Sequence, residues 1–429
     1  MSKLIINGGK PLQGTTKPVA NKNSIIKLIP AAILTEEDIT ISNVPKTSDV
    51  QYMLDILVKL WWTHQRINDD TIVINGKNIT NHVIDPEISE KMKASVMFAG
   101  PLLARLWKAS MPTPQWCKLW TRPMDVFIEN MIAMNCTYTY DHGSYDIHTS
   151  WLQATEVRQR FPSVTGTENL ILMAVKAKWQ TIIYNAWSEP HTQDLCNMLV
   201  SMGADIQWIG SNKLIITGVE ELHGTKRTVI SDHLDVAGVI TATVMTNWQV
   251  TIENAVVEHM HLIIQAMKKL GIQLDVDEKN DTISVWPQKN LTISKTIKGD
   301  YLELAAWPRP LLPMDLMPIL LVLAMHCEGS AIIQNPYYTT QFFFVQELAK
   351  MKWRTVMADP HRIITFWPTA RKPANLLCGD IIQSSYGMLM ACLAAPGTST
   401  LNAITPLFRR FPNLVKQFND LGADVRLKK

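Results

Sequence analysis

The segment from residue 250 to residue 285, VTIENAVVEHMHLIIQAMKKLGIQLDVDEKNDTISV, contains one full copy of a pattern that recurs along this chain. Its first residues are β-rich and end in Asn254, which is typical of a short strand followed by a turn. Apolar residues at helical spacing then lead to Leu270-Gly271, and Gly is favoured just after the last helical residue. Two short β-rich runs complete the segment. The pattern predicts a strand, an amphipathic helix and a hairpin.

The same pattern recurs through the whole chain. Helices are predicted to end at Leu60-Trp61, Met134-Asn135, Met202-Gly203, Leu270-Gly271, Met351-Lys352 and Leu421-Gly422. β-rich runs that end in Asn occupy residues 39–43, 181–185, 250–254 and 331–335. Copies lie about 70 residues apart, so the 429 residues hold six units. Six units predict two domains of three units each, with an α/β or α+β architecture and a substrate cleft between similar halves.

The composition is that of an ordinary globular protein, with 47% apolar and 18% charged residues. A net charge of +3 gives no reason to expect nucleic acid, but it is compatible with a small anionic substrate. The first residues lack the apolar core of an export signal. The longest apolar stretch, residues 316–325, is shorter than the roughly 20 residues of a transmembrane helix. We therefore expect a buried helix there and no membrane insertion.

Six cysteines are scattered along the chain without a Cys-x-x-Cys pair, at Cys117, Cys136, Cys196, Cys327, Cys378 and Cys392. In a large chain without an export signal, this distribution favours reduced thiols and a cytoplasmic location. The pair His259 and His261 is not interpreted as a metal site. The chain has no Gly-x-x-x-x-Gly-Lys loop and no Gly-x-Gly-x-x-Gly turn, which argues against nucleotide triphosphate or dinucleotide chemistry.

Cys117 lies in a predicted loop, residues 112–123, that has prolines at both ends. Lys118 and Arg122 beside it would lower the pKa of the thiol and make it a usable proton donor or nucleophile. The alternative is an inert, partly buried cysteine, which the sequence alone favours.

Lys22 and Asn23 precede a helix that is expected to begin near Ser24. A helix N-terminus with an adjacent lysine is a plausible anion site. A solvated lysine beside a capping Asn is the simpler interpretation of this segment.

Asp315 opens the apolar helix and is either its N-cap or, near a sugar hydroxyl, a general base. Arg409 and Arg410 lie in a loop between Pro406 and Pro412. An arginine there either clamps a phosphate or carboxylate or, as is usual for paired surface arginines, is solvated.

Several short motifs follow one another along nearly the whole chain. They are Lys22-Asn23, Asn43-Val44-Pro45 with Asp49, Lys93-Ala94-Ser95 followed by Gly100-Pro101-Leu102, the segment 117–125, Pro162-Ser163-Val164, Glu189-Pro190 and Pro313-Met314-Asp315. None of them is decisive alone. Their order on a six-unit repeat resembles the UDP-N-acetylglucosamine 1-carboxyvinyltransferase family, a branch of the enolpyruvyl transferases that makes the first committed step of peptidoglycan synthesis.

The resemblance implies a two-domain inside-out α/β barrel, with three units per domain and the active site in the cleft between the domains. The first domain would be residues 22–230, with a catalytic loop at 112–123, and the second residues 1–21 and 231–429. The implied partners are phosphoenolpyruvate and UDP-N-acetylglucosamine. The resemblance implies no metal, no organic cofactor and no nucleic acid, and it leaves the oligomeric state open.

The resemblance also implies a reaction and roles within it. The sugar 3′-hydroxyl would add to C2 of phosphoenolpyruvate, and phosphate would leave from a tetrahedral intermediate. Cys117 would protonate the methylene carbon, and Asp315 would take the hydroxyl proton. Lys22, Arg122 and Arg409 would hold the phosphate and carboxylate of phosphoenolpyruvate.

The remaining implied contacts belong to the sugar nucleotide. Asn23 would contact it directly, residues 122–126 its uridine and residues 163–166 its diphosphate. All the substrate-contacting residues implied in this way are Lys22, Asn23, Asp49, Lys93, Arg122, Pro123, Met124, Asp125, Val126, Ser163, Val164, Thr165, Gly166, Asp315, Tyr337 and Arg409.

The sequence departs from the family at four positions of this site. Lys93 stands where the family has Arg, and Gln341 and Ile382 stand where two more arginines are expected. Tyr337 replaces a smaller apolar residue. The loss of two cations should weaken anion binding by roughly 1.5–3 kcal/mol per charged hydrogen bond.

A second departure concerns tryptophan. Seven of the 14 tryptophans stand where the family has Gly, namely Trp61, Trp107, Trp116, Trp120, Trp179, Trp248 and Trp367. Our hypothesis is that a codon read as glycine in the source organism is written here as tryptophan.

Two other functions fit the same sequence less well. The related transferase acting on shikimate 3-phosphate shares the repeat, but gives no reason for Cys117 or the Ser163-Val164 segment. A degenerate protein that binds the sugar nucleotide without turnover is favoured by Gln341 and Ile382 and disfavoured by Cys117 together with Asp315.

Overall fold

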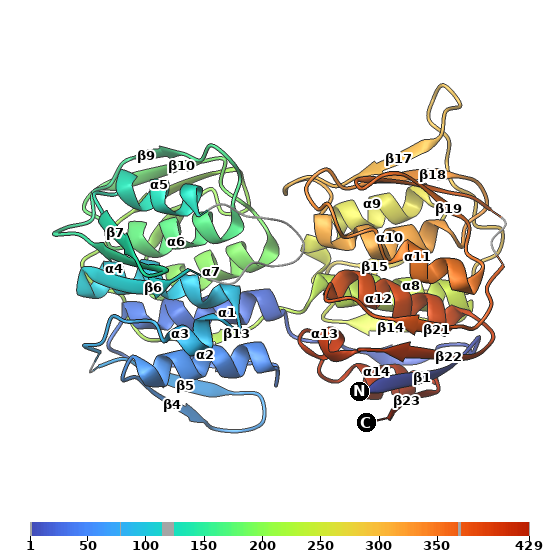
Figure 1. The fold of residues 1–429 in the computed structure, drawn as a ribbon, viewed down its shortest axis with the longest axis horizontal. Helices are drawn as coiled ribbons and strands as arrows, with labels where there is room; N and C mark the ends of the chain where they lie inside the picture. Colours follow the sequence, from blue (N-terminus) through green and yellow to red (C-terminus); the bar gives the residue numbers. More distant parts are fainter. Residues whose placement is uncertain (1, 78, 114–123, 368–369, 429) are drawn as a thin grey trace.

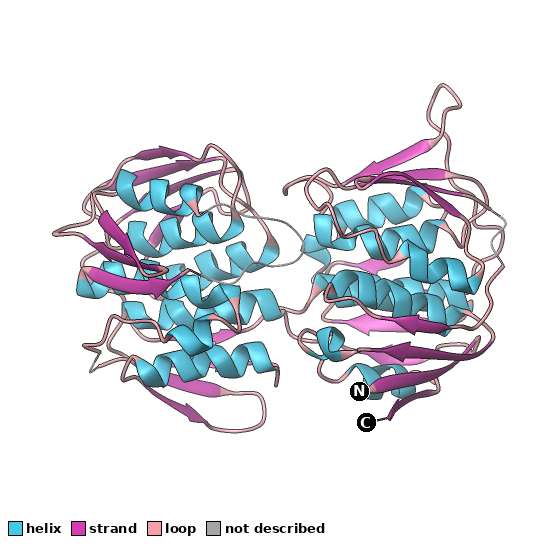
Figure 2. Cartoon of the chain, in the orientation of Figure 1, coloured by secondary structure: helices cyan, strands magenta, loops and turns pink. Residues whose placement is uncertain are grey.

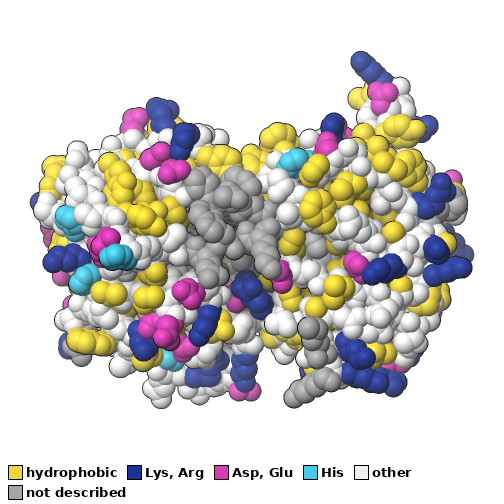
Figure 3. Space-filling view, in the orientation of Figure 1, with side chains coloured by type: hydrophobic (Ala, Val, Ile, Leu, Met, Phe, Trp, Pro, Cys, Tyr) yellow, Lys and Arg dark blue, Asp and Glu magenta, His cyan; other side chains and the backbone are white. Residues whose placement is uncertain are grey.

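The computed structural model describes residues 2–77, 79–113, 124–367 and 370–428. Figure 1 shows them as two lobes side by side, with both chain ends in the same lobe. On the face drawn in Figure 3, acidic and basic side chains are interspersed over both lobes. This surface agrees with a net charge of only +3.

The described strands of the first lobe form three sheets. Their orders are β13 (Thr225–Thr228), β3 (Ile39–Ser42), β5 (Ile72–Asn75) and β4 (Thr63–Arg66); β11 (Asp205–Gln207), β12 (Lys213–Thr217), β10 (Gln180–Tyr184) and β9 (Glu156–Arg158); and β6 (Lys108–Pro112), β8 (Ser144–His148) and β7 (Thr137–Asp141).

The described strands of the second lobe form three more sheets. Their orders are β21 (Asn375–Leu377), β22 (Gly397–Asn402), β1 (Lys3–Gly8) and β23 (Val425–Lys428); β15 (Asp275–Asp277), β16 (Thr282–Val285), β14 (Val250–Glu253) and β2 (Gly14–Thr16); and β17 (Leu302–Ala305), β18 (Ala331–Gln334), β20 (Arg362–Thr365) and β19 (Thr355–Asp359). The N-terminal strands β1 and β2 thus complete sheets whose other strands come from residues 250–428.

The helices lie inside each lobe and the sheets outside (Figure 2), which is the inside-out α/β arrangement. The first lobe contains α1 (Lys22–Ala31), α2 (Ser48–Lys59), α3 (Pro86–Ser89), α4 (Ala99–Leu106), α5 (Asp125–Ala133), α6 (Val164–Ala174), α7 (Pro190–Ser201) and the 3₁₀ turns η1 (Ala32–Leu34) and η2 (Lys93–Phe98). The second contains α8 (His233–Thr246), α9 (His261–Lys269), α10 (Met317–Ala324), α11 (Val345–Leu348), α12 (Ile382–Ala394), α13 (Thr405–Phe408), α14 (Leu414–Asp420) and the 3₁₀ turns η3 (Val257–His259), η4 (Met314–Leu316) and η5 (Ala349–Met351).

Each lobe has its own hydrophobic core. One core is built from residues 20–229, and the other from residues 4–12 and 234–425 with Trp187 added from the first lobe. The inner helices supply fully buried side chains such as Leu28 in α1 and Leu320 in α10. Each such burial contributes about 1.5–3 kcal/mol.

The chain passes between the lobes twice, and the two passages lie against each other. Ala20 and Ser231 form an antiparallel bridge there. The Asn21 amide donates to the Ile230 carbonyl at 2.8 Å, and the Asp232 amide donates to the Val19 carbonyl at 2.8 Å. Helices α1 and α8 therefore both begin at the junction of the lobes.

The repeat predicted from the sequence is confirmed at its helix ends. Five of the α-helices end at Lys59, Ala133, Ser201, Lys269 and Asp420, and in the remaining unit α11 continues into the 3₁₀ turn η5, which ends at Met351; all six ends lie within two residues of the predicted positions. The chain then enters the left-handed region at each end, with φ of 68° at Trp61, 69° at Asn135, 104° at Gly203, 90° at Gly271, 66° at Lys352 and 94° at Gly422. This conformation is natural for glycine.

Four tryptophans adopt left-handed backbone, with φ of 68° at Trp61, 63° at Trp107, 70° at Trp179 and 67° at Trp208. A residue with a β-carbon incurs about 1–2 kcal/mol of strain there. Burial of the indoles offsets little of this strain, because Trp61 is 67%, Trp179 73% and Trp208 60% exposed. Three of these positions are among those where the resemblance expects Gly. Trp208 was not identified from the sequence.

The apolar stretch at residues 316–325 forms the buried helix α10, as predicted. Within the described ranges, no helix has both the length and the apolar character needed to cross a membrane. The five cysteines in those ranges are free and buried. Cys117 lies outside them.

Candidate active site

The inner helices of both lobes begin around one cavity of about 250 Å³. Helices α1, α6, α8 and α12 start there directly, and α4 and α10 start there through η2 and η4. The first or second residue of each start lines the cavity, and the same holds for α2 and α7, so that eight helix starts surround it. These residues are Lys22, Asp49, Lys93, Thr165, His191, His233, Asp315 and Gln383. Helix N-termini carry partial positive charge and free N–H groups, so the repeat itself makes this cavity favourable for an anion.

Two cations from different lobes share one carboxylate in this cavity. Lys22 Nζ donates to Asp49 Oδ2 at 2.7 Å. Arg409 donates from Nε to Asp49 Oδ1 at 3.0 Å and from Nη2 to Oδ2 at 3.3 Å. Asp49 lies in the first turn of α2 and is 2% exposed. Burial alone would raise the pKa of Asp49, but Lys22 and Arg409 hold it below its ordinary value. An entering anion would compete with Asp49 for both cations.

Lys22 itself is not the solvated lysine that the segment suggested. It is 8% exposed, and burial lowers its pKa against the attraction of Asp49. The helix begins at Lys22 rather than near Ser24, and its cap is Asn21, whose Oδ1 accepts from the Ser24 amide at 3.1 Å. The cap therefore lies two residues before Asn23, which lines the cavity instead.

Asp315 is not a helix cap. It lies inside the 3₁₀ turn η4, which follows Pro313, and no side chain caps that turn. Its carboxylate is 24% exposed and lines the cavity, with Arg410 Nη1 3.5 Å from Oδ2.

Arg410 is not solvated either, which corrects the expectation for paired arginines. It is 2% exposed and donates to both oxygens of Asp232, from Nε at 2.6 Å and from Nη2 at 2.9 Å. Its only sequence signal was its place beside Arg409 between two prolines.

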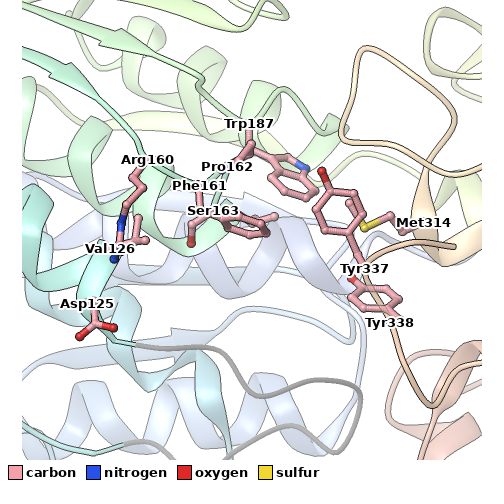
Figure 4. A pocket seen from close by; sticks show the side chains of 11 residues that line it. Asp125, Val126, Arg160, Phe161, Pro162, Ser163, Trp187, Met314, Tyr337 and Tyr338 are labelled. Carbon is pink, nitrogen blue, oxygen red and sulfur yellow. The ribbon is translucent and has the colours of Figure 1, made fainter. Parts of the chain in front are cut away.

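A second cavity of about 350 Å³ adjoins the first (Figure 4). Its lining residues are Asp125, Val126, Arg160, Phe161, Pro162, Ser163, Val164, Trp187, Met314, Tyr337 and Tyr338. The ring centroids of Phe161 and Tyr337, one from each lobe, are 5.8 Å apart. Four residues line both cavities, namely Val164, Trp187, Met314 and Tyr338. A ring-lined space beside a cationic one suits a ligand with flat apolar faces joined to charged groups.

Buried ionisable groups surround the first cavity. Glu189 Oε2 lies 3.3 Å from Arg309 Nε across the lobes, and burial raises the pKa of Glu189 against that arginine. His191 and His233 line the cavity, and burial together with nearby cations holds both pKa values well below the ordinary 6.5. Both imidazoles are therefore neutral at neutral pH.

Most of the predicted site residues meet at these cavities. The first is lined by Lys22, Asn23, Asp49, Lys93, Val164, Thr165, Asp315 and Arg409, and the second by Asp125, Val126, Ser163, Val164 and Tyr337. Met124 instead precedes α5 and packs on the first core, and Gly166 lies in the first turn of α6, its amide capped by Ser163 Oγ at 3.2 Å. Cys117, Arg122 and Pro123 lie outside the described residues.

The two positions that lack an expected arginine do not face the cavities. Gln341 is fully buried, where its Oε1 accepts from Asn335 Nδ2 at 2.6 Å and its Nε2 donates to the Met314 carbonyl at 3.2 Å. Ile382 packs against the second core. His191, His233 and Gln383 line the first cavity although no sequence motif pointed to them, and Arg410, one of the two paired arginines, lines it as well.

The pattern of the EPSP synthase (3-phosphoshikimate 1-carboxyvinyltransferase) family matches residues 6–416. The chain therefore belongs to this family of enolpyruvyl transferases, as the sequence resemblance indicated. The UDP-N-acetylglucosamine 1-carboxyvinyltransferase of Bacteroides thetaiotaomicron is 33% identical over 434 residues, with 99% of each chain covered. The enzyme of the same name from Bradyrhizobium diazoefficiens is 33% identical over 422 residues, with 98% of this chain and 97% of that one covered.

Solved structures share the fold. The enolpyruvyl transferase NikO from Streptomyces tendae superposes with a TM-score of 0.87 at 22% identity, covering 100% of this chain and 99% of that one. An EPSP synthase from Acinetobacter baumannii superposes with a TM-score of 0.78 at 16% identity, with 100% of both chains covered.

Proposed function

We propose that this protein transfers the enolpyruvyl group of phosphoenolpyruvate to the 3′-hydroxyl of UDP-N-acetylglucosamine and releases phosphate, the first committed step of peptidoglycan synthesis. The observation that carries the proposal is the pair of adjoining cavities, one cationic and one ring-lined, in a chain whose full-length relatives bear that enzyme's name. The reaction would take place in the cytoplasm.

The first cavity is proposed as the phosphoenolpyruvate site. Lys22, Lys93 and Arg409 line it, and eight helix starts surround it. Fixed cations and dipoles stabilise the charge of the tetrahedral intermediate without reorganising, which is usually the largest catalytic contribution. Arg122 is assigned to the same substrate from the family resemblance.

The second cavity is proposed as the sugar nucleotide site. Asp125 and Val126 would contact the uridine, and the start of α6 at Ser163 and Val164 would contact the diphosphate. Met314 lines both cavities and Asp315 follows it directly, so a hydroxyl at the boundary comes within reach of this carboxylate.

The proposed reaction balances as an addition and an elimination with three proton transfers. The hydroxyl oxygen bonds to C2 of phosphoenolpyruvate, Asp315 takes the hydroxyl proton, and C3 gains a proton from Cys117. Phosphate then leaves C2 as C3 loses a proton to the Cys117 thiolate formed in the addition, which gives the enol ether. The role of Cys117 rests on the family resemblance.

The two cores support the domain boundaries we propose, residues 22–230 for the first domain and residues 1–21 with 231–429 for the second. Each domain would comprise three units, and the active site would lie in the cleft between the domains. The ion pairs Asp49–Arg409 and Glu189–Arg309 join the lobes around that site.

Phosphate release measured with phosphoenolpyruvate and each acceptor in turn tests the function. We expect release with UDP-N-acetylglucosamine and none with shikimate 3-phosphate. The reverse preference would assign the chain to the other branch of the family. Tight binding of UDP-N-acetylglucosamine without any release would favour the degenerate binding protein, which the buried Gln341 and the packed Ile382 make the second candidate.

A further inference from the structure

The loop after α13 places a second arginine, Arg410, beside Asp315, the carboxylate that is proposed as the base. Arg410 is buried at the edge of the first cavity, and one edge of its guanidinium is saturated by Asp232. The remaining nitrogen, Nη1, lies 3.5 Å from Asp315 Oδ2. A planar guanidinium fixed on one edge presents its other N–H groups in a fixed direction.

Asp232, the partner of Arg410, is itself held by a hydrogen bond. Asp232 is the N-cap of α8, where its Oδ1 accepts from the Leu234 amide at 3.0 Å. Phe411 stacks on Tyr386 with ring centroids 4.1 Å apart, and Tyr386 donates to Asp235 Oδ1 at 2.7 Å. The Tyr386 ring fits because Gly238 has no β-carbon, which would lie 2.2 Å from Cε1.

The turn that carries Asp315 is fixed from its other side as well. Asn335 Nδ2 and Gln341 Nε2 both donate to the Met314 carbonyl, at 3.4 Å and 3.2 Å. The backbone of η4 is thereby held, and Arg410 is positioned to hold the carboxylate of the next residue.

We propose that Arg410 is a positioning residue for Asp315, whose carboxylate it holds oriented toward the acceptor hydroxyl through a guanidinium that Asp232 fixes in place. This inference rests on the proposed role of Asp315 as the base. A purely structural role, pinning residue 410 to the start of α8, would require only the contact with Asp232.

Other titratable groups share the cavity with Asp315. Glu189 interacts electrostatically with Asp315, and Lys22, Asp49, His233 and Arg409 line the same cavity. Because burial raises the pKa of Glu189, its titration must be separated from that of Asp315. The variant Asp315→Asn makes this separation, because it removes only the limb of the pH profile that belongs to Asp315.

The test is the pH dependence of kcat for phosphate release, from about pH 5 to about pH 9, in the full-length enzyme with both substrates. Arg410→Gln combined with Asp232→Asn removes the buried charges together. We expect kcat to fall about 10²-fold at neutral pH, with both KM values changing far less. The acidic limb of the pH profile should move to higher pH, because the guanidinium that is lost lies 3.5 Å from the Asp315 carboxylate.

The single variant Arg410→Lys keeps the positive charge but loses the planar guanidinium that can donate to Asp232 and Asp315 at the same time. It should leave the limb in place and lower kcat about tenfold, and it serves if the double variant does not fold. The matched control is Arg362→Gln, because Arg362 forms an exposed pair with Asp359 at 2.7 Å. That control should leave kcat and the limb unchanged.

Four outcomes would overturn the assignment. A folded double variant with the wild-type limb would show that Arg410 is only structural, as would an Arg410→Lys variant with wild-type kcat. A rise in the KM for phosphoenolpyruvate larger than the fall in kcat would make Arg410 a binding residue instead. If Asp315→Asn turns over at the wild-type rate with its limb intact, the proposed base fails, and the role of Arg410 falls with it.

Discussion

The thiols that the structure describes are all unsuited to proton transfer. Burial raises the pKa of Cys136, Cys196, Cys327 and Cys392 to about 12, and that of Cys378 to about 11. Such thiols neither ionise near neutral pH nor reach substrate. The proton transfer proposed for Cys117 therefore has no substitute among them.

We predict that Cys117→Ser loses at least about 10²-fold in turnover, the low end of the usual worth of a positioned acid. Binding of UDP-N-acetylglucosamine, measured by titration calorimetry, should be largely unchanged, because the thiol is assigned to the methylene carbon of phosphoenolpyruvate. Cys117→Asp should retain turnover, since a carboxylic acid can also supply the proton. Cys392→Ser, at a buried thiol in α12, is the control. Wild-type phosphate release by Cys117→Ser would remove this cysteine from the mechanism.

Trp61 and Trp62 make a matched pair of neighbouring indoles. Trp61 is 67% exposed with φ of 68°, whereas Trp62 is 4% exposed, with the Arg105 guanidinium 5.6 Å from its ring. We predict that Trp61→Gly raises the free energy of unfolding by about 1 kcal/mol, because glycine adopts left-handed backbone without strain. Trp62→Gly should lower it by about 3–5 kcal/mol through loss of buried volume. Urea unfolding measures both, and a Trp61→Gly protein no more stable than the wild type would contradict the strain.

Arg410 shows why single residues were harder to predict than elements. Whether it is solvated or buried depends on Asp232, 178 residues earlier in the chain, which local sequence cannot reveal. The burial of Lys22 could not be read from its own segment for a similar reason, because its partner Asp49 comes from another element. The choice of Asn21 over Asn23 as the cap depends on local sequence, but both residues are asparagines and so suit that position equally.

At the scale of elements, the helices and their ends were predictable because their signals are local. Leu270 with Gly271 and Met202 with Gly203 mark the last apolar residue and the left-handed residue that follows it. That eight helix starts surround one cavity could not be predicted, because it depends on how three sheets pack around each core.

Comparison of repeated elements also bears on the tryptophans. The segment 179–185, WQTIIYN, aligns with 329–335, GSAIIQN, and each segment contains one strand, β10 in the first and β18 in the second. The first residue is left-handed in both, with φ of 70° at Trp179 and 117° at Gly329, and Gly397, the first residue of β22, has φ of 108°. The repeat itself thus places glycine where Trp179 stands.

We predict that the protein purified from its source organism carries glycine at positions 61, 107, 179 and 208. Mass measurement of peptides spanning these positions checks this directly. Trp353 is a useful comparison, because it is 4% exposed and is not among the left-handed residues. Tryptophan found at position 179 would end the codon hypothesis.

At the scale of the whole molecule, buried histidines couple stability to pH. Burial, followed by nearby cations, lowers the pKa of His191 and His233 well below 6.5 and that of His259 and His326 to about 4. Between about pH 6.5 and 4 these histidines bind protons in the unfolded chain but not in the folded protein. Each histidine therefore destabilises the fold by about 1.4 kcal/mol per unit as the pH falls.

We predict that His233→Gln reduces this pH dependence of the free energy of unfolding between pH 7 and pH 5, measured in urea. The comparison is made between variants because buried acids with raised pKa, such as Glu168 and Glu189, act in the opposite sense. His142, whose side chain is 94% exposed, supplies the control His142→Gln. Identical slopes for wild type and His233→Gln would contradict the linkage.

The sheet order β21-β22-β1-β23 has a consequence for how the protein is made. As the chain leaves the ribosome, the first lobe has all its described strands once residue 228 has emerged. Strand β1 is synthesised before any of them, yet both strands that flank it lie between residues 397 and 428. The earliest strand of the protein must therefore wait, unpaired, for the last, and the second lobe can close only when synthesis is almost complete.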